Sequence, residues 1–171
     1  GWYYITIEYA EITADATLRY FDIYGASGGS WTVEYFDEYD WDEEDEDDID
    51  VLARREVDAS ENKTYDNEPG IDLYAPDMPK GIGGSGSSRD DFAVRFTRYF
   101  KLNGKYQFTA QYDDGMRIWI DGDLVMDRWK SQGGVAQKEF DRRLHDGYHV
   151  IKVEYYDGSG AAVCRLSWRK V

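Results

Sequence analysis

The stretch Asp113-Asp114-Gly115-Met116-Arg117-Ile118-Trp119-Ile120-Asp121-Gly122 decides the fold of this chain. Apolar side chains occupy every second position from Met116 to Ile120, a period of two that is typical of a strand with one buried face. The dipeptide Asp121-Gly122 that follows favours the positive φ angles of a two-residue hairpin turn. The stretch therefore predicts a β-strand, a tight turn and the start of a returning strand.

The same period of two recurs in short runs along the chain, and no stretch of helical length keeps a 3.6-residue apolar stripe. Asn103-Gly104 is a second turn dipeptide and predicts a hairpin between two long aromatic strands. We therefore expect an all-β domain, an antiparallel β-sandwich or barrel. The predicted strands are residues 2–9, 17–24, 31–35, 93–102, 106–112, 116–120, 124–127, 148–156 and 162–169.

Composition limits what the chain can bind. The 171 residues suit one domain, and 35 acidic against 20 basic residues give a formal net charge of −15, which argues against nucleic acid as a partner. No run of about 18 apolar residues predicts a membrane span. The only cysteine, Cys164, alternates with Leu166 and Trp168 and is expected in the core. The chain starts at Gly1 without a basic and apolar leader, so we expect a secreted protein whose signal peptide has been removed.

Several segments interrupt the strand pattern. Residues 40–50 are acidic at nine of eleven positions, and residues 69–88 carry all three prolines, so we expect surface loops at both. Unspaced like charges in the acidic run favour a solvated segment over a defined ion site. Asn62-Lys63-Thr64 is a sequon for glycosylation. Residues 1–30 are predicted to be a strand-forming extension, either an extra hairpin or a donor strand for a neighbouring copy.

Three aspartates are candidate metal ligands. Asp113 and Asp114 are neighbours, and their side chains would point to opposite faces of an ordinary strand, whereas a cis peptide bond would turn both the same way. Asp157 also follows a predicted strand, and Gly158 after it allows backbone carbonyls near Ser159 to approach an ion. Together these groups would supply the all-oxygen shell that calcium prefers. The alternative interpretation of both segments is an ordinary turn.

His145 and His149 are a weaker candidate. They stand four residues apart, which is a metal-ligand spacing on a helix, whereas residues 148–156 are predicted to form a strand. We therefore do not predict a metal site from this pair.

A set of motifs resembles the protective-antigen-like (PA-fourteen) domain family over about residues 31–171. The central motif, residues 113–122, is long enough to be specific. The matching segments are residues 31–36, 91–97, 113–122, 124–125, 129, 147–149, 154–156 and 166–168.

The resemblance implies a β-sandwich or barrel domain of secreted and cell-surface proteins, which include toxins, glycosidases and yeast adhesins. In the sugar-binding members an Asp-Asp pair joined by a cis peptide bond holds a calcium ion that contacts sugar hydroxyls. That pair corresponds here to Asp113 and Asp114. A later loop gives those members an Asn ligand, and Asp157, with Gly158 and Ser159, takes its place. The change from Asn to Asp adds negative charge, which should help cation binding.

We therefore expect residues 31–171 to form an extracellular or cell-surface carbohydrate-binding and adhesion module that depends on Ca²⁺. Sugar hydroxyls would replace waters on the ion, and Trp119 or Trp129 would stack on the sugar ring. The alternative is a structural subunit of a self-assembling filament or surface layer, joined to copies of itself through the N-terminal extension. No enzymatic activity is expected, because nothing singles out two carboxylates as a glycosidase pair.

Overall fold

The computed structural model describes residues 31–36, 53–57, 70–73 and 90–171. These ranges form eight strands: β1 (Trp31–Phe36), β2 (Ala53–Val57), β3 (Gly70–Leu73), β4 (Phe92–Asp113), β5 (Gly115–Ile120), β6 (Asp123–Arg128), β7 (Ala136–Asp157) and β8 (Val163–Lys170). All pairings are antiparallel, so the all-β prediction is confirmed. Within the described ranges, no helix is long and apolar enough to cross a membrane.

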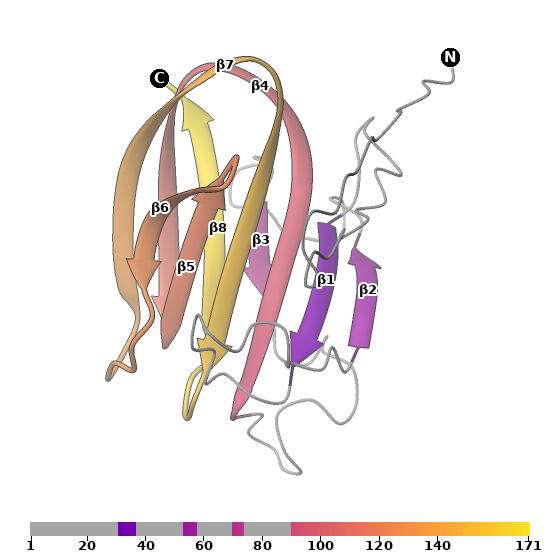
Figure 1. Cartoon of the computed structure of the whole chain (residues 1–171). Helices are drawn as coiled ribbons and strands as arrows, with labels where there is room; N and C mark the ends of the chain where they lie inside the picture. The colour runs from indigo at the N-terminus through magenta and orange to yellow at the C-terminus, as the bar shows by residue number, and fades with distance from the viewer. Residues whose placement is uncertain (1–30, 37–52, 58–69, 74–89) are drawn as a thin grey trace, which may run out of the picture.

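Two long strands build both layers of the sandwich. β4 and β7 each have 22 residues and pair along almost their whole length, from Phe92 opposite Asp157 to Tyr112 opposite Ala136. Both strands bend over at the top of Figure 1 and run down again on the other side. The beginning of β4 therefore pairs with β1, whereas its end pairs with β8.

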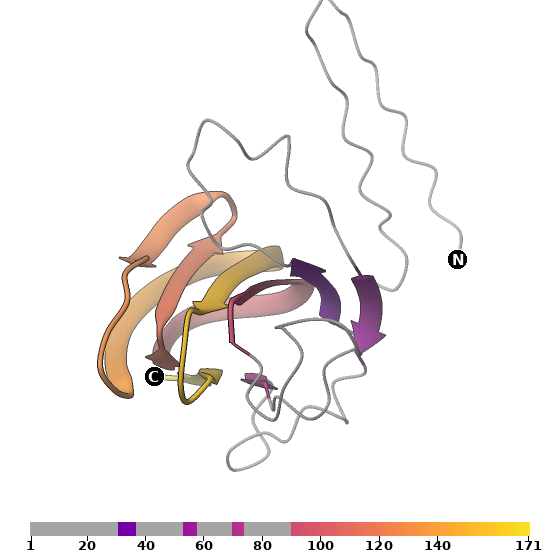
Figure 2. The same cartoon turned by 90° about the horizontal axis from the view of Figure 1, so that it is seen from below.

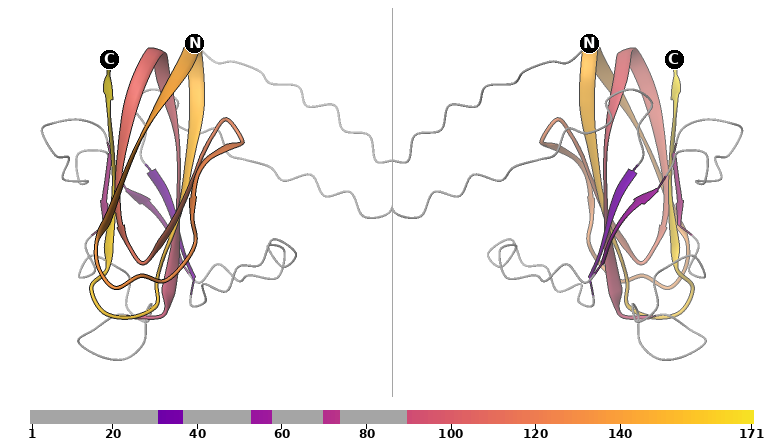
Figure 3. Two further views of the ribbon diagram at one scale, coloured as in Figure 1. Left: turned by 90° about the vertical axis from the view of Figure 1, so that its left-hand side faces the viewer. Right: turned by 90° about the vertical axis from the view of Figure 1, so that its right-hand side faces the viewer.

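The two layers face each other below this bend, as the edge-on views in Figure 3 show. The β1 layer has the strand order β2-β1-β4-β7-β5-β6. The β8 layer contains the end of β4, the beginning of β7, β8 and β3. Figure 2 looks at the molecule from the end opposite the bend.

The bend lies at Asn103-Gly104, which the sequence analysis interpreted as a two-residue hairpin. That prediction is wrong, because β4 passes through the dipeptide without reversing direction. Gly104 has a φ of 102° and Gly147 on the partner strand has a φ of 150°. The pairing also shifts between Leu102 and Gly104, as it does at a β-bulge. A positive φ serves a bulge as well as a turn, so the dipeptide bends a continuous strand instead of ending it.

The core fills the space between the layers. Phe100 of the β1 layer meets Trp168 of the β8 layer edge to face, with ring centroids 4.7 Å apart. Trp31 lies 5.5 Å from the same Phe100 ring, and Phe108 lies 5.7 Å from Trp168. Cys164 is buried in this cluster, as its alternation predicted. The Phe100–Trp168 contact thus joins the two layers, and the other two contacts lie within one layer each.

Most of the predicted strands after residue 90 are confirmed, and so is the hairpin turn at Asp121-Gly122, with φ angles of 55° and 85°. Three elements were not predicted: β2, β3 and the beginning of β7. β3 lies inside the predicted loop 69–88, where Ile71 is buried and pairs with Leu166. The loop prediction is wrong there, because a strand of four residues is too short to leave a periodic pattern.

Some predictions fall on residues that the structure does not describe. These are the strands at 2–9 and 17–24, the acidic run 40–50 and the sequon at Asn62. The N-terminal extension 1–30 lies outside the described residues as well, so its separation from a domain at 31–171 stays a prediction.

Charges alternate in sign across the outer face of the β1 layer. The strand register aligns, from β1 to β6, Glu34, Arg95, Glu154, Arg117 and Asp127. Glu154 is fully buried and accepts a hydrogen bond of 3.0 Å from Arg95 Nε, and Lys152 Nζ lies 3.1 Å from the same carboxylate oxygen. Opposite charges on neighbouring strands stabilise a sheet, so this row favours the observed pairing of the strands.

Gly115 begins β5 against the ring of Tyr156. A Cβ atom at Gly115 would lie 2.0 Å from Tyr156 Cε1, whereas a Cβ at Gly133 would meet nothing within 4 Å. We expect Gly115→Ala to lower the free energy of unfolding by about 1–3 kcal/mol through overpacking. Gly133→Ala is the matched control and should change it by less than about 0.5 kcal/mol. Urea denaturation measures both, and equal losses would contradict the close contact.

Candidate functional site

Aspartates gather at the end of the sandwich opposite the bend. Because β4 and β7 fold back on themselves, their ends return to this end of the molecule, at the bottom of Figure 1. Asp113 ends β4 and Asp157 ends β7, while Asp90 and Asp91 directly precede β4. The pairing of Phe92 with Asp157 brings the beginning of β4 beside the end of β7.

The peptide bond between Asp113 and Asp114 is cis. This is the geometry that the sequence analysis required for two neighbouring carboxylates to point the same way. Both side chains are nearly inaccessible to solvent, with exposed fractions of 7% for Asp113 and 2% for Asp114. The hydroxyl of Tyr155 donates a hydrogen bond to the backbone carbonyl of Asp113. The pair is therefore part of the folded interior and is no solvated turn.

Asp114 is held by hydrogen bonds to both carboxylate oxygens. Its Oδ1 accepts from the Ser131 hydroxyl at 3.0 Å and from the Gln132 amide at 2.9 Å, and its Oδ2 accepts from the Gly158 amide at 3.0 Å. Burial raises the pKa of Asp114, but these bonds and one from the Ser159 amide outweigh it, so the pKa is lowered. Asp114 is therefore an ionised, firmly oriented carboxylate.

Asp157 is in the opposite situation. It is 1% exposed, and neither of its carboxylate oxygens has a hydrogen-bond partner among the described residues. Burial, followed by the charges of Asp114, Asp90, Asp113 and Asp91, raises its pKa to about 7. Unpartnered buried carboxylate oxygens beside further carboxylates form the donor set that a hard divalent cation such as Ca²⁺ prefers.

The pKa of Asp113 is raised, as is that of Asp157. Its pKa is raised by burial and then by the charge of Asp114. Burial and the neighbouring carboxylates therefore make it unfavourable for Asp113, Asp114 and Asp157 to be ionised together. A divalent ion would lower the pKa of both raised carboxyl groups.

The structure brings the predicted metal residues together but separates the two predicted tryptophans. Asp113, Asp114 and the 157–159 loop lie together. Gly158 and Ser159 contact Asp114 through their backbone amides. The sequence analysis had instead predicted that backbone carbonyls near Ser159 face an ion. Trp129 precedes Ser131 in the connection between β6 and β7, so it belongs to a segment that contacts the site.

The surroundings of the two tryptophans differ. Trp129 packs edge to face on Tyr156, with centroids 4.7 Å apart, and the Arg117 guanidinium lies 4.8 Å from its ring centre. Trp119 lies five residues beyond Asp114 on β5, roughly 16 Å along an extended strand. Lys152 Nζ lies 3.8 Å from the centre of the Trp119 ring. The structure therefore places Trp129 near the site and Trp119 away from it.

Four residues around the site were not predicted: Asp90, Asp91, Ser131 and Gln132. Asp90 accepts a hydrogen bond of 3.1 Å from the Gly160 amide, which ties the 157–160 loop to the beginning of β4. Gln132 also donates its side-chain amide to the Tyr112 carbonyl at 2.8 Å. If the sequence analysis had paired the predicted strand 93–102 with the strand that ends before Asp157, it would have placed Asp90 and Asp91 next to Asp157. Ser131 and Gln132 have no such signal, because their contact depends on the path of a connection.

The sequence pattern that defines PA14 domains matches residues 79–170. The chain belongs to the PA14 domain family. This confirms the resemblance seen in the sequence, and the matched segment contains the whole aspartate cluster.

Known proteins resemble this PA14 domain in sequence and in fold. It is 33% identical over 103 residues to the anti-sigma-I factor RsgI3 of Acetivibrio thermocellus, an alignment that covers 59% of this chain and 16% of that protein. It therefore corresponds to a small part of that relative's length.

Two solved structures share the architecture at lower identity. The PA14 sugar-binding domain of an RTX adhesin superposes with a TM-score of 0.58 at 21% identity, covering 84% of this chain and 90% of that one. The A domain of epithelial adhesin 9 from Candida glabrata, solved with Galβ1-3GlcNAc, gives 0.52 at 15% identity, covering 85% and 83%. At these identities the likeness shows the fold.

The pH dependence of stability tests the state of Asp157. Its folded pKa, about 7, lies above the ordinary 3.8, so its contribution to stability is present below pH 3.8 and is lost as the pH rises through 7. We expect Asp157→Asn to reduce the loss of melting temperature of the ion-free protein between about pH 4 and 7. The control Glu139→Gln, an exposed carboxyl on the same strand, should follow the wild type. Parallel curves for all three proteins would contradict a strained Asp157.

Proposed function

We propose that this PA14 domain is a calcium-dependent carbohydrate-binding module of an extracellular or cell-surface protein. The observation that carries the proposal is the buried Asp157 carboxylate, whose oxygens lack partners among the described residues beside Asp113 and Asp114. A calcium ion satisfies such a set because it accepts six to eight oxygen ligands in flexible geometry.

Asp113, Asp114 and Asp157 would hold the ion. Four donors already surround Asp114, so an ion bound to it would share its oxygens with those hydrogen bonds or displace one of them. Ser131 and the amide of Gly158 orient that carboxylate from two different connections. Bound calcium would supply open coordination positions to a pair of sugar hydroxyls. The residues around it then decide which sugars fit.

The connection from Trp129 to Val135 would form the sugar-facing wall. Its beginning is fixed by the Ser131 and Gln132 contacts with Asp114, so a sugar on the ion would meet its outer part. Val135 is 57% exposed, and the backbone at Gly133 is open. An apolar side chain and an unobstructed backbone suit the flat face of a sugar ring. The sugar-binding adhesin domain of the same fold supports this use of the architecture.

We propose that the domain binds without turning over its ligand and that it forms part of a longer protein. Its correspondence to 16% of an anti-sigma factor fits a recognition module attached to other domains. Release of reducing sugar from glycosides by the pure chain would contradict the absence of turnover. The alternative function as a filament subunit depends on residues 1–30, which lie outside the described residues, and stays a prediction.

A glycan array probed with the full chain in calcium and in chelator tests the proposal. We expect calcium to raise the melting temperature, with an apparent Kd between about 10⁻⁶ and 10⁻³ M, and to be required for glycan retention. Because affinity for one sugar should be weak, the chain is displayed as multimers on beads. Asp114→Asn should abolish both effects, and Asp141→Asn, an exposed carboxylate on β7, should abolish neither.

The two readouts separate the two parts of the proposal. Calcium-dependent melting without glycan retention would leave an ion site and refute the carbohydrate ligand. Glycan retention that persists in chelator would refute the dependence on calcium.

A further inference from the structure

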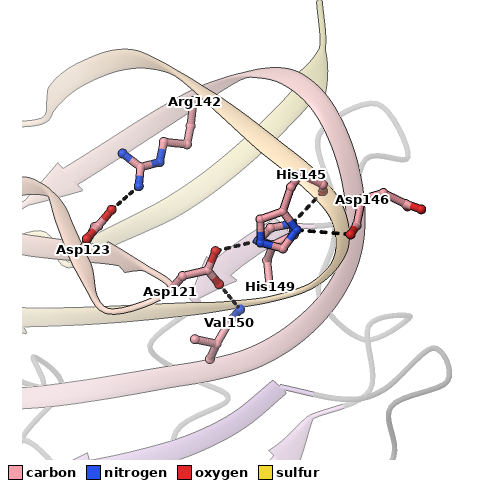
Figure 4. A network of polar contacts seen from close by, with 7 residues as sticks. All are labelled: Asp121, Asp123, Arg142, His145, Asp146, His149 and Val150. Carbon is pink, nitrogen blue, oxygen red and sulfur yellow. Dashed lines mark hydrogen bonds and ion pairs between the residues drawn. The ribbon is translucent and has the colours of Figure 1, made fainter.

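A second group of metal-ligating side chains lies at the other end of β5. Asp121, His145 and His149 each offer one ligand atom, and these atoms all lie within 4.8 Å of one another. Figure 4 shows the three side chains meeting between the β5–β6 turn and the bend of β7. Asp121 is seven residues beyond Asp114, roughly 23 Å on an extended strand. The group is therefore separate from the aspartate cluster.

The bend in β7 brings the two histidines together. In a regular strand, residues four apart are roughly 13 Å apart, which is too far for one ion. Here Leu144 pairs with Gly104 and Gly147 pairs with Leu102, so the chain from 145 to 146 is a bulge opposite a single residue. The two imidazole rings consequently lie with their centroids 4.4 Å apart. The sequence analysis predicted no metal site here because residues four apart in a straight strand lie too far from each other. That reasoning does not apply at this bulge.

Each of the three side chains is oriented by a contact with the backbone. Asp121 Oδ1 accepts a hydrogen bond of 3.0 Å from the Val150 amide. His149 Nε2 lies 3.0 Å from the His145 carbonyl, and His145 Nδ1 lies 3.1 Å from the Asp146 carbonyl. A carbonyl oxygen only accepts, so both of these ring nitrogens carry a proton.

These backbone contacts leave one ligand atom on each side chain. The remaining atoms are Asp121 Oδ2, His149 Nδ1 and His145 Nε2. Metal-binding histidines in proteins almost always donate their second ring N–H to a carbonyl, carboxylate or water in this way. The arrangement has the supporting contacts of a metal site on all three side chains.

We propose that Asp121, His145 and His149 bind one divalent transition-metal ion, with Zn²⁺ as the reference ion. Two imidazoles and one carboxylate are ligands that suit zinc, whereas calcium prefers oxygen alone. Three protein ligands leave a fourth position on the ion for water or an external donor. That position is reachable, because Asp121 and His145 are exposed while His149 is buried.

Binding requires a small rearrangement. Asp121 Oδ2 and His149 Nδ1 are 2.6 Å apart and share a proton, which the ion replaces and releases to solvent. Zinc bonds of about 2.0–2.1 Å place ligand atoms roughly 3.3 Å apart, so this pair opens by several tenths of an ångström. The exposed His145 ring moves towards the ion. The buried His149 ring and the hydrogen bond between Asp121 and the Val150 amide stay in place.

The neighbouring charges do not oppose a cation. Arg142, the one arginine drawn in Figure 4, is paired with Asp123, which follows the β5–β6 turn. Asp146 contacts His145 through its backbone carbonyl, and its carboxylate points away from the three side chains. An ion held here would join the β5–β6 turn to the bend of β7, and we expect it to stabilise the top of the sandwich.

Calorimetric titration of the full chain with Zn²⁺, in saturating calcium, tests the proposal. Calcium would occupy the calcium site proposed above and does not compete for nitrogen ligands. We expect one zinc ion per chain at this site and a higher melting temperature with zinc. His145→Ala removes an exposed ligand, so the fold should survive, and affinity should fall about 100-fold or more.

A matched pair of substitutions in one turn supplies the control. Asp121→Asn removes a proposed ligand, and Asn tolerates the φ of 55° at this position. Asp123→Asn removes a neighbouring carboxylate that is not a ligand. We expect the first to weaken zinc binding as His145→Ala does, and the second, which removes only the partner of Arg142, to weaken it far less. Absence of saturable zinc binding by the wild type, or equal binding by Asp121→Asn and Asp123→Asn, would overturn the proposal.

Discussion

The strands β4 and β7 have to bend at the same level, because each hydrogen-bonds to the other along almost its whole length. The positive φ angles at Gly104 and Gly147 allow this, and one long hairpin becomes two facing layers. Both ends of each strand then return to one end of the molecule, where the aspartates meet. At the opposite end of the molecule, the bulge of β7 at this bend brings the His145 ring next to the His149 ring. Both clusters are products of one pairing.

Asp114 and Asp157 are equally buried but differ in how their charge is accommodated. Four donors, three of them backbone amides, surround Asp114 and favour its ionised form. Asp157 has no such donors among the described residues and is exposed to the field of four other carboxylates. A fold that tolerates this arrangement needs stability from elsewhere, and the aromatic core, with its Phe100–Trp168 contact between the layers, contributes to it. In the proposed calcium site, affinity for the ion and stability without it are thus opposed at one residue.

Local pattern was sufficient for the all-β class, for β5 with its turn and for the core position of Cys164. It misinterpreted Asn103-Gly104, because a turn and a bulge use the same φ angles and only the pairing of distant strands distinguishes them. The beginning of β7 was missed because its side chains are mostly exposed and polar. Asp113, Asp114 and Asp157 could be named from the chain and the family pattern. The contributions of Asp90 and Ser131 depend on how separate segments meet, which no local pattern contains.

The alternating row of charges guards against a particular error of assembly. If β7 slid by two residues, its apolar side chains would still face the core, so hydrophobic alternation alone does not prevent the slip. The slip that moves Lys152 into the place of Glu154 would set it opposite both Arg95 of β4 and Arg117 of β5. Three cations would then stand side by side where an anion now lies between two of them. In a misfolded intermediate of this kind, Lys152 would be repelled by the arginines on both neighbouring strands. This repulsion disfavours the shifted alignment relative to the native one.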